Sequence, residues 1–219
     1  MIIYFIRHGH PDYVNDTLTE LGHKHAKAAA ERLKHYGIEK IFSSTNGRAH
    51  LTAEYTARVL GLDIVPLEFM REISWSPLRG EKSEICDPWG VSRIFANEGK
   101  SLDRCDWYLE EPFCNSKIVE SYNTVIEGFD SWLLDLGYMR EGDFYRVVGD
   151  NTDKTVALFS HGGSSSAAIS HMLCIPFIRF CSMFHIDFTG ITAIELPDEK
   201  GKLVCPRLLF SDATHILSI

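Results

Sequence analysis

Short apolar runs alternate along the chain with longer stretches in which apolar residues recur at helical spacing. The runs are rich in β-branched and aromatic residues and are bounded by glycine or polar residues, which predicts buried strands. We expect these strands at residues 2–6, 40–44, 64–65, 155–160, 190–196 and 203–210.

The helical stretches carry the residues that usually begin and end helices. Thr19 is placed to cap a helix that extends through residue 36, where Gly37 ends it. A second helix is expected over residues 47–60, with Gly61 at its end. Two further helices are expected over residues 122–136 and 164–173.

Residues 74–150 interrupt this alternation with prolines, acidic residues and aromatic residues such as Trp75 and Trp107. We interpret the segment as an insertion in a single domain of residues 1–219, where it forms a lid or a substrate-specificity region. Its aromatic side chains are expected to build a small core of their own, or to stack on a substrate. If the chain forms a homodimer, we expect the contacts in this segment.

The alternation of predicted strands and helices along the chain indicates an α/β fold. More specifically, it predicts a three-layer α/β/α sandwich with a mostly parallel central sheet. The chain has 219 residues, of which 45% are hydrophobic, and this is enough for one sizeable core.

The net charge of −8 argues against nucleic acid and anionic membranes as partners, because both call for a basic face. The first residues carry no basic leader, and no stretch of about eighteen apolar residues could span a membrane. The cysteines lack C-x-x-C spacing and are expected to be free thiols. We therefore expect a cytoplasmic protein without a membrane span.

Two histidines follow predicted strands directly. Arg7-His8-Gly9 comes after the strand at 2–6, and Ser160-His161-Gly162-Gly163 lies between the strand at 155–160 and a helix. The carboxyl ends of strands open into the ligand crevice of α/β sheets, where glycines allow close backbone approach and a helix N-terminus attracts anions. The two motifs predict an anion site that gathers cations in an otherwise acidic protein.

With these motifs the chain resembles the histidine phosphatase superfamily, whose members are phosphoglycerate-mutase-like. The resemblance spans nearly the whole chain. It also rests on Leu18 to Gly22, on Ser43-Ser44 followed by Arg48-Ala49 and Thr52-Ala53, on Leu67 to Glu72, and on Glu120-Ser121.

The resemblance implies a role for each matching residue. His8 would be the nucleophile that forms a phosphohistidine. Arg7 and Arg48 would clamp the phosphoryl oxygens, because guanidinium groups match phosphate geometry. His161 would be an opposing cation, and Glu72 a general acid that protonates the leaving group.

Phosphate contacts are further expected from the backbone of Gly9 and Gly162 and from Asn15, whose offset is one residue longer than in the usual family pattern. Val119 replaces the glycine that usually precedes the pair at 120–121, so a role for Glu120 is left open. The reaction needs no cofactor, since such transfers depend on positioning and electrostatic stabilisation.

A metalloenzyme is the alternative from another class, because His8 and His10, like His23 and His25, show H-x-H spacing. A barrel-type metal site would need further ligands on later strands of a repeated β/α barrel, which this chain does not supply. We expect no metal ligand among these residues.

Within the family the choice lies between a phosphatase and a phosphomutase. A mutase must exclude water and retain a bisphosphate, but no long tail follows Asp212 to close over the site. We therefore expect a metal-independent phosphomonoesterase acting on a small phosphorylated metabolite. The phosphomutase remains the alternative, and a non-catalytic module that binds phosphorylated ligands remains the remote one.

Overall fold

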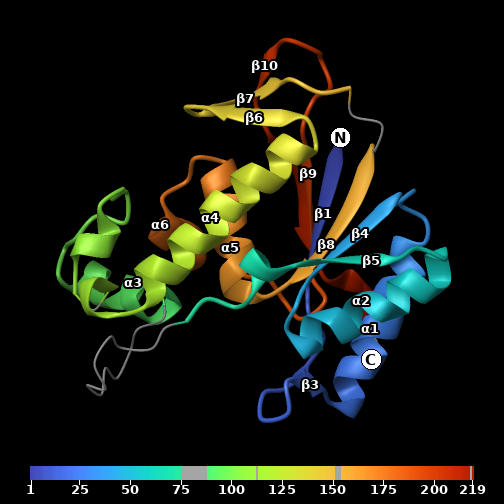
Figure 1. Ribbon diagram of the computed structural model, residues 1–219. Helices are drawn as coiled ribbons and strands as arrows, with labels where there is room; N and C mark the ends of the chain where they lie inside the picture. Colours follow the sequence, from blue (N-terminus) through green and yellow to red (C-terminus); the bar gives the residue numbers. More distant parts are fainter. Residues whose placement is uncertain (75–87, 112, 151–153, 218) are drawn as a thin grey trace.

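A six-stranded mixed sheet forms the centre of the protein, in the order β11-β9-β1-β8-β4-β5 (Figure 1). The computed structural model describes residues 1–74, 88–111, 113–150, 154–217 and 219. Four neighbouring strands run parallel: β1 (Ile2–Arg7), β8 (Thr155–Ser160), β4 (Lys40–Ser44) and β5 (Ile64–Leu67). Two antiparallel strands, β9 (Ile191–Glu195) and β11 (Arg207–Asp212), complete one edge. The predicted mostly parallel sheet is confirmed.

Helices cover both faces of this sheet, which confirms the three-layer α/β/α sandwich (Figure 1). The alternation of side chains along β1 divides the two cores: Ile3 and Phe5 face one, Tyr4 and Ile6 the other. The larger core includes residues of α4 (Ile118–Asp135), α5 (Gly162–Met172) and α6 (Phe177–Met183). The smaller core takes residues from α1 (Glu20–Leu33) and α2 (Gly47–Leu60).

Two predicted helix ends, the start of α1 and the end of α2, are confirmed. The predicted end of α1 at residue 36 is wrong: the helix ends at Leu33, and a turn follows in which the N–H of Tyr36 donates to Leu33 O at 3.0 Å. The Thr19 hydroxyl accepts the N–H of Gly22 at 3.1 Å and begins α1. Gly61 ends α2 in the left-handed conformation at φ +68°. By contrast, α4 begins at Ile118, four residues before the predicted start at residue 122. Its N-cap residue, Lys117, makes no side-chain cap, and the Ser116 hydroxyl accepts the N–H of Ile118 at 3.1 Å.

The predicted strand at 203–210 is two strands in two different sheets. Pro206 lies between them and cannot donate to a ladder. The second part is β11, whereas β10 (Leu203–Val204) joins an unpredicted hairpin of β6 (Tyr138–Glu141) and β7 (Phe144–Val147). A small sheet of β2 (Pro11–Asp12) and β3 (Thr17–Leu18) closes the loop after β1.

The segment at 74–150 holds α3 (Pro88–Asn97), the 3₁₀ helices η2 (Trp107–Leu109) and η3 (Phe113–Asn115), and α4 with the hairpin. Trp107 is 4% exposed and packs its ring 5.2 Å from those of Phe113, Tyr122 and Phe177. These aromatic residues are part of the larger core, where Trp107 contacts Phe177 of α6, so the expectation of a separate small core in this segment is wrong. Residues 75–87, with Trp75, and residue 112 lie outside the described residues, and the lid role stays a prediction.

Two further 3₁₀ turns complete the described chain, η1 (Glu68–Met70) after β5 and η4 (Thr214–Ile216) after β11. No single helix within the described ranges is long and apolar enough to cross a membrane. In the same ranges, α5 and α6 taken together meet the criteria of length and composition, but the two helices are bent by 120° relative to each other.

Candidate active site

The four parallel strands bring the candidate residues to one edge of the sheet. His8 follows β1, and its N–H donates to Ser160 O at the end of β8 at 2.9 Å. His161 follows β8, and Ser44 ends the neighbouring β4. Glu72 follows β5 and η1. The carboxyl ends of the strands therefore assemble one site from distant segments, as expected for an open α/β sheet.

The His8 ring is held with one nitrogen free. Its Nδ1 lies 2.7 Å from Gly9 O, and because a carbonyl only accepts, Nδ1 carries the proton and Nε2 the lone pair. The residue is 1% exposed. Burial lowers the pKa of His8 to about 3, helped by Arg7 and Arg48 and opposed by the Gly9 hydrogen bond. His8 is therefore a neutral imidazole with an unprotonated Nε2 near neutral pH, the form that a nucleophile requires.

The second histidine lies opposite, with its ring centroid 5.2 Å from that of His8. His161 Nε2 lies 2.8 Å from the hydroxyl of Ser44, which also accepts the N–H of Asn46 at 3.2 Å. Because the Ser44 oxygen already accepts from Asn46, we assign its hydroxyl proton to the contact with His161. His161 Nε2 then accepts this proton's hydrogen bond, and Nδ1 carries the ring proton. That Nδ1 is buried and has no partner among the described residues. The Nδ1–H group is therefore a buried donor without an acceptor in that part of the chain.

The charge of His161 differs from the expected cation. Burial lowers its pKa well below the usual value, and Arg48, His8 and Arg7 lower the pKa further. The protein groups around His161 therefore favour its neutral form, in which the ring still donates from one nitrogen. A bound phosphate dianion would raise the pKa again, because an opposite charge favours the imidazolium.

In each of the two arginines at the site, one guanidinium nitrogen, Nη1, is fixed by a protein acceptor. Arg7 Nη1 donates to Ile186 O at 2.7 Å, and its Cζ lies 4.2 Å from the ring centroid of Phe188. Arg48 Nη1 pairs with Asp16 Oδ1 at 2.5 Å. Nε of each arginine is buried and has no partner among the described residues. The two guanidinium groups are thus preorganised, and each keeps a free donor.

Unpaired buried donors are concentrated here. Eight buried side-chain polar atoms lack a partner within the described ranges, and three of them belong to residues around His8: Arg7 Nε, Arg48 Nε and His161 Nδ1. Each such atom costs about 1–3 kcal/mol when nothing pairs with it. An anion with several oxygens would pair with them together.

Glu72 lies at the N-terminus of α5. Its Oε1 accepts the N–H of Ser164 at 3.1 Å and of Ile73 at 2.9 Å, and Oε2 accepts the N–H of Gly163 at 3.4 Å. Burial nevertheless raises the pKa of Glu72, against the opposing effects of these N–H groups and of Arg48. A carboxyl group with a raised pKa beside an anion site is suited to donate a proton near neutral pH.

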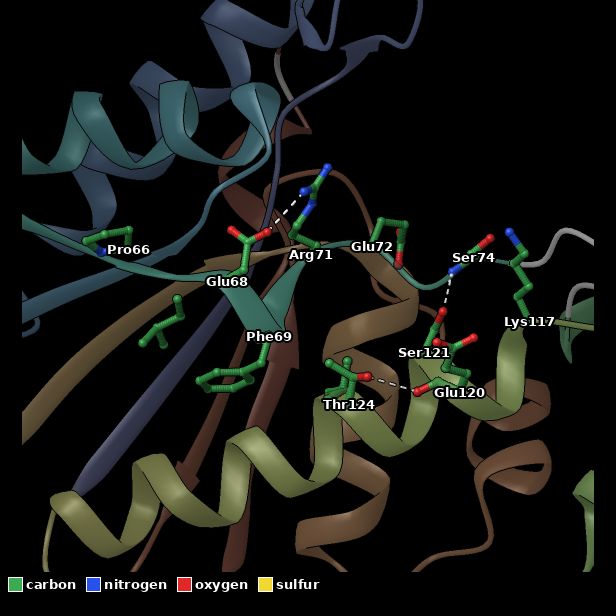
Figure 2. A pocket seen from close by; sticks show the side chains of 12 residues that line it. Pro66, Glu68, Phe69, Arg71, Glu72, Ser74, Lys117, Glu120, Ser121 and Thr124 are labelled. Atoms are coloured by element: carbon green, nitrogen blue, oxygen red, sulfur yellow. Dashed lines mark hydrogen bonds and ion pairs between the residues drawn. The ribbon is translucent and has the colours of Figure 1, made fainter.

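A cavity of about 830 Å³ adjoins Glu72 (Figure 2). Arg71 and Glu72 lie on one side, and α4 forms the other side with Glu120, Ser121 and Thr124, next to Lys117 just before its first turn. Arg71 pairs with Glu68 at 3.0 Å, whereas the Lys117 ammonium has no partner in the part of the chain that the structure describes. A smaller cavity of about 330 Å³ borders Arg7 and Gly162 on another side.

The remaining predicted residues are placed differently. The N–H of Gly9 donates to Thr52 Oγ1 at 3.0 Å, and a Cβ on Gly9 would lie 2.6 Å from Gly22 O, so this glycine allows close backbone packing. Gly162 begins α5 beside Arg7, since a Cβ there would lie 3.5 Å from Arg7 Cζ. Asn15 is exposed and donates to Asp12 Oδ2 at 2.7 Å. Their phosphate contacts stay predictions.

Three residues at the site were not predicted to have a role. Ser44 bonds His161, Asp16 bonds Arg48, and Phe188 packs against both Arg7 and His8. Only Ser44 carried a signal, because it ends a predicted strand beside the other strand ends. No group of three or more His, Cys, Asp or Glu side chains within the described ranges could hold a metal ion.

Comparisons with known proteins agree with this geometry. Residues 3–207 match the family model of the histidine phosphatase superfamily, branch 1. A Hydrogenobacter thermophilus protein with the provisional name phosphoserine phosphatase 2 is 23% identical over 211 residues, 92% of this chain and 93% of that protein. A provisionally named phosphoglycerate mutase of Yersinia pestis, GpmB, is 28% identical over 113 residues, 46% of this chain and about half (53%) of its own length.

Among solved structures, a phosphoserine phosphatase mutant from Entamoeba histolytica in complex with phosphoserine shares the fold. Its TM-score is 0.66 at 23% sequence identity, and the match covers 99% of both chains.

Proposed function

The chain belongs to branch 1 of the histidine phosphatase superfamily, and from its site we propose that it is a metal-independent phosphomonoester hydrolase acting through a phosphohistidine on His8. One observation carries the proposal. A neutral imidazole with a free Nε2 lies near three buried donors of Arg7, Arg48 and His161 that have no partner among the described residues. A phosphoryl group would satisfy these donors while it faces the nucleophile.

The first step transfers the phosphoryl group to His8. The Nε2 lone pair attacks phosphorus as the bond from phosphorus to the ester oxygen breaks, and Glu72 gives its proton to the departing alkoxide. The free donors of Arg7, Arg48 and His161 stabilise the charge on the phosphoryl oxygens.

The second step returns the enzyme to its starting state. Glu72, now a carboxylate, takes a proton from water as the water oxygen attacks phosphorus. The bond between phosphorus and Nε2 breaks, inorganic phosphate leaves, and His8 recovers its lone pair while Glu72 is protonated again.

We further propose that the leaving group is a small metabolite with a carboxylate. The cavity next to Glu72 presents the Lys117 ammonium and the Ser121 hydroxyl. Its other lining cation, Arg71, is paired with Glu68, and the Glu120 carboxylate lies on the same wall as Lys117. Charge-assisted hydrogen bonds to a carboxylate would use the free Lys117 ammonium. Phosphoserine and phosphoglycerate, which appear in the names of similar proteins, both carry a carboxylate close to the phosphate.

The test is release of inorganic phosphate from matched substrates, with and without chelator. We expect turnover of phosphoserine and 3-phosphoglycerate to exceed that of glycerol 3-phosphate, which lacks the carboxylate, and chelator to have no effect. Loss of activity on chelation would contradict the metal-independent mechanism. Interconversion of phosphoglycerates without release of phosphate would identify a mutase instead.

A variant pair examines the leaving-group cavity. Lys117→Gln should raise KM about tenfold for the acidic substrates and leave glycerol 3-phosphate unchanged, because it removes one charge-assisted hydrogen bond worth about 1.5 kcal/mol. Lys27→Gln, on the exposed face of α1, is the matched control. Equal effects of Lys117→Gln on both kinds of substrate would contradict the carboxylate contact.

A further inference from the structure

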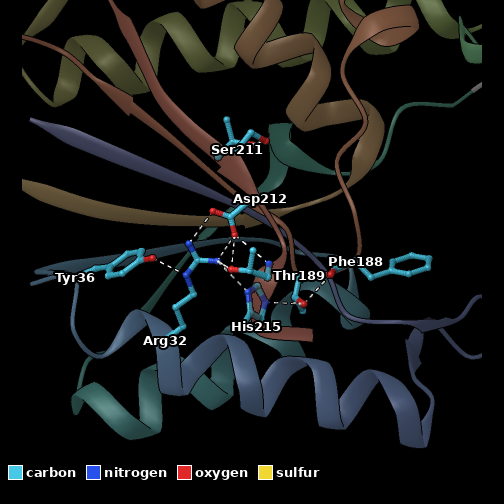
Figure 3. Close-up of polar contacts among 9 residues, drawn as sticks. Arg32, Tyr36, Phe188, Thr189, Ser211, Asp212 and His215 are labelled. Atoms are coloured by element: carbon cyan, nitrogen blue, oxygen red, sulfur yellow. Dashed lines mark hydrogen bonds and ion pairs between the residues drawn. The ribbon is translucent and has the colours of Figure 1, made fainter. Parts of the chain in front are cut away.

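A chain of hydrogen bonds leads from α1 to the loop that precedes β9 (Figure 3). Arg32 Nη1 lies 3.3 Å from His215 Nδ1, His215 Nε2 lies 3.1 Å from Thr189 Oγ1, and Thr189 Oγ1 donates to Phe188 O at 2.7 Å. Asp212 holds the start of the chain, since its Oδ2 accepts from Arg32 Nη2 at 2.9 Å.

The proton positions in this chain are determined by its two ends. A guanidinium only donates, so His215 Nδ1 must carry the lone pair and Nε2 the proton. A carbonyl only accepts, so the Thr189 hydroxyl donates to Phe188 and accepts from His215. Burial, followed by the charge of Arg32, lowers the pKa of His215 to about 4. One neutral tautomer of His215 is therefore compatible with the chain.

Thr189 adopts a conformation that its side chain disfavours. Its φ is +54°, in the left-handed region that β-branched residues rarely occupy, and it is fully buried. Its N–H donates to the carbonyl of His8 at 3.2 Å, so the strained residue bonds directly to the backbone of the proposed nucleophile. Strain of this kind persists when the surrounding contacts enforce it, and it clusters at functional sites.

The loop that Thr189 anchors supplies the contacts of Arg7. Ile186 O accepts from Arg7 Nη1 at 2.7 Å, and Gly190 O accepts the Arg7 N–H at 3.2 Å. The Phe188 ring lies 4.2 Å from Arg7 Cζ and 5.7 Å, between centroids, from the His8 ring. The position of this loop therefore sets the position of one guanidinium and one face of the nucleophile.

We propose that His215 and Thr189 are positioning residues for the phosphoryl-transfer site: their hydrogen-bond chain holds residues 186–190 so that Arg7 meets the transferring phosphoryl group. The inference rests on the proposed function, but it assigns roles to residues that touch neither the phosphoryl group nor the leaving group. Because Arg7 stabilises charge on the transferring group, a shift of the loop lowers kcat more than it raises KM.

Two pairs of variants of the full-length protein test this hydrogen-bond chain. For each variant we would measure turnover of p-nitrophenyl phosphate, calorimetric binding of inorganic phosphate, and thermal unfolding. Thr189→Val keeps the branched shape without the hydroxyl, and His215→Ala removes the donor; each should lower kcat by about 10–100-fold with KM changed by less than about threefold. Thr189→Ser and His215→Gln keep a donor within reach and should recover kcat to within about fivefold of wild type.

His171→Ala is the matched control, because His171 is another partly buried histidine, paired with Asp130 at 2.9 Å near the far end of α5. It should lose stability without the specific loss of kcat. Equal kcat in wild type, Thr189→Val and His215→Ala would overturn the inference, as would failure of the Ser and Gln variants to recover while they unfold at the wild-type temperature. A wild type that binds phosphate but hydrolyses no monoester would overturn the proposed function instead.

Discussion

In the proposed mechanism, Ser44 determines which nitrogen of His161 faces the substrate, so replacing Ser44 by alanine should impair catalysis out of proportion to its small size. The change removes the only hydroxyl that the structure places on His161 Nε2, at 2.8 Å, among the described residues. It also removes the acceptor of the Asn46 N–H. Without the Ser44 donor, the His161 proton is no longer confined to Nδ1, and the ring loses its orientation.

The magnitude follows from the buried position of these atoms. Ser44 and His161 are both fully buried, so a polar atom left unpaired costs about 1–3 kcal/mol. If that cost is carried into the transition state, where His161 Nδ1 must donate, kcat/KM falls by about 5–150-fold at 1.36 kcal/mol per tenfold. Stability should fall by a similar energy.

Ser43→Ala separates the catalytic effect from the structural one. Ser43 is equally buried on the same strand, but its hydroxyl donates to Ser44 O at 2.9 Å and forms no hydrogen bond with a site side chain among the described residues. Steady-state hydrolysis of p-nitrophenyl phosphate gives kcat/KM, and urea unfolding of the same samples gives the free energy of unfolding. Ser44→Ala should lose kcat/KM, whereas Ser43→Ala should lose only stability. If the two variants agree in kcat/KM within about twofold, the reasoning about the His161 tautomer is refuted.

Three further predictions concern neighbouring groups. Glu72→Gln should lower kcat for phosphoserine by about 100-fold or more, but for p-nitrophenyl phosphate much less, because nitrophenolate leaves without a proton; equal losses would argue against a general acid. The native pKa of His8, about 3, lies below its ordinary 6.5, so the unfolded state takes up a proton that the native state refuses, and stability falls as pH drops below about 6.5. His8→Gln should therefore remove up to about 2 kcal/mol of the stability difference between pH 7 and pH 5 in urea unfolding, and an unchanged difference would contradict the lowered pKa. Asp16→Ala removes both the Arg48 partner and the acceptor of the Gly47 N–H at 2.7 Å, so vanadate should bind about tenfold more weakly, whereas Asp12→Ala in the same loop should leave binding unchanged.

The parts of the fold that could be predicted are those with local signals. The strands before His8 and His161 are continuous apolar runs, and Thr19 and Gly61 mark helix ends by their own chemistry. Because the carboxyl ends of parallel strands lie at one edge of the sheet, the sequence predicted that His8 and His161 lie close together. The hairpin β6–β7 and the short helix α6 carry no comparable pattern.

The rest of the site depends on contacts between distant segments. Asp16 reaches Arg48 because the loop after β1 folds onto the start of α2, and Phe188 reaches Arg7 only through the strained turn at Thr189. No local pattern encodes either contact. The neutral state of His161 also follows from burial, which single residues do not reveal. The phosphate contacts of Asn15, the homodimer and the cytoplasmic location stay predictions.

In the proposed mechanism His8 carries the phosphoryl group, and trapping the covalent intermediate tests this role most directly. The enzyme would be mixed with a ³²P-labelled phosphate monoester, quenched in alkali, digested and mapped by mass spectrometry. We predict a label that is stable in alkali, labile in acid, located on the peptide that contains His8, and absent from His8→Ala. Turnover that persists in His8→Ala, or a label on another residue, would contradict the account.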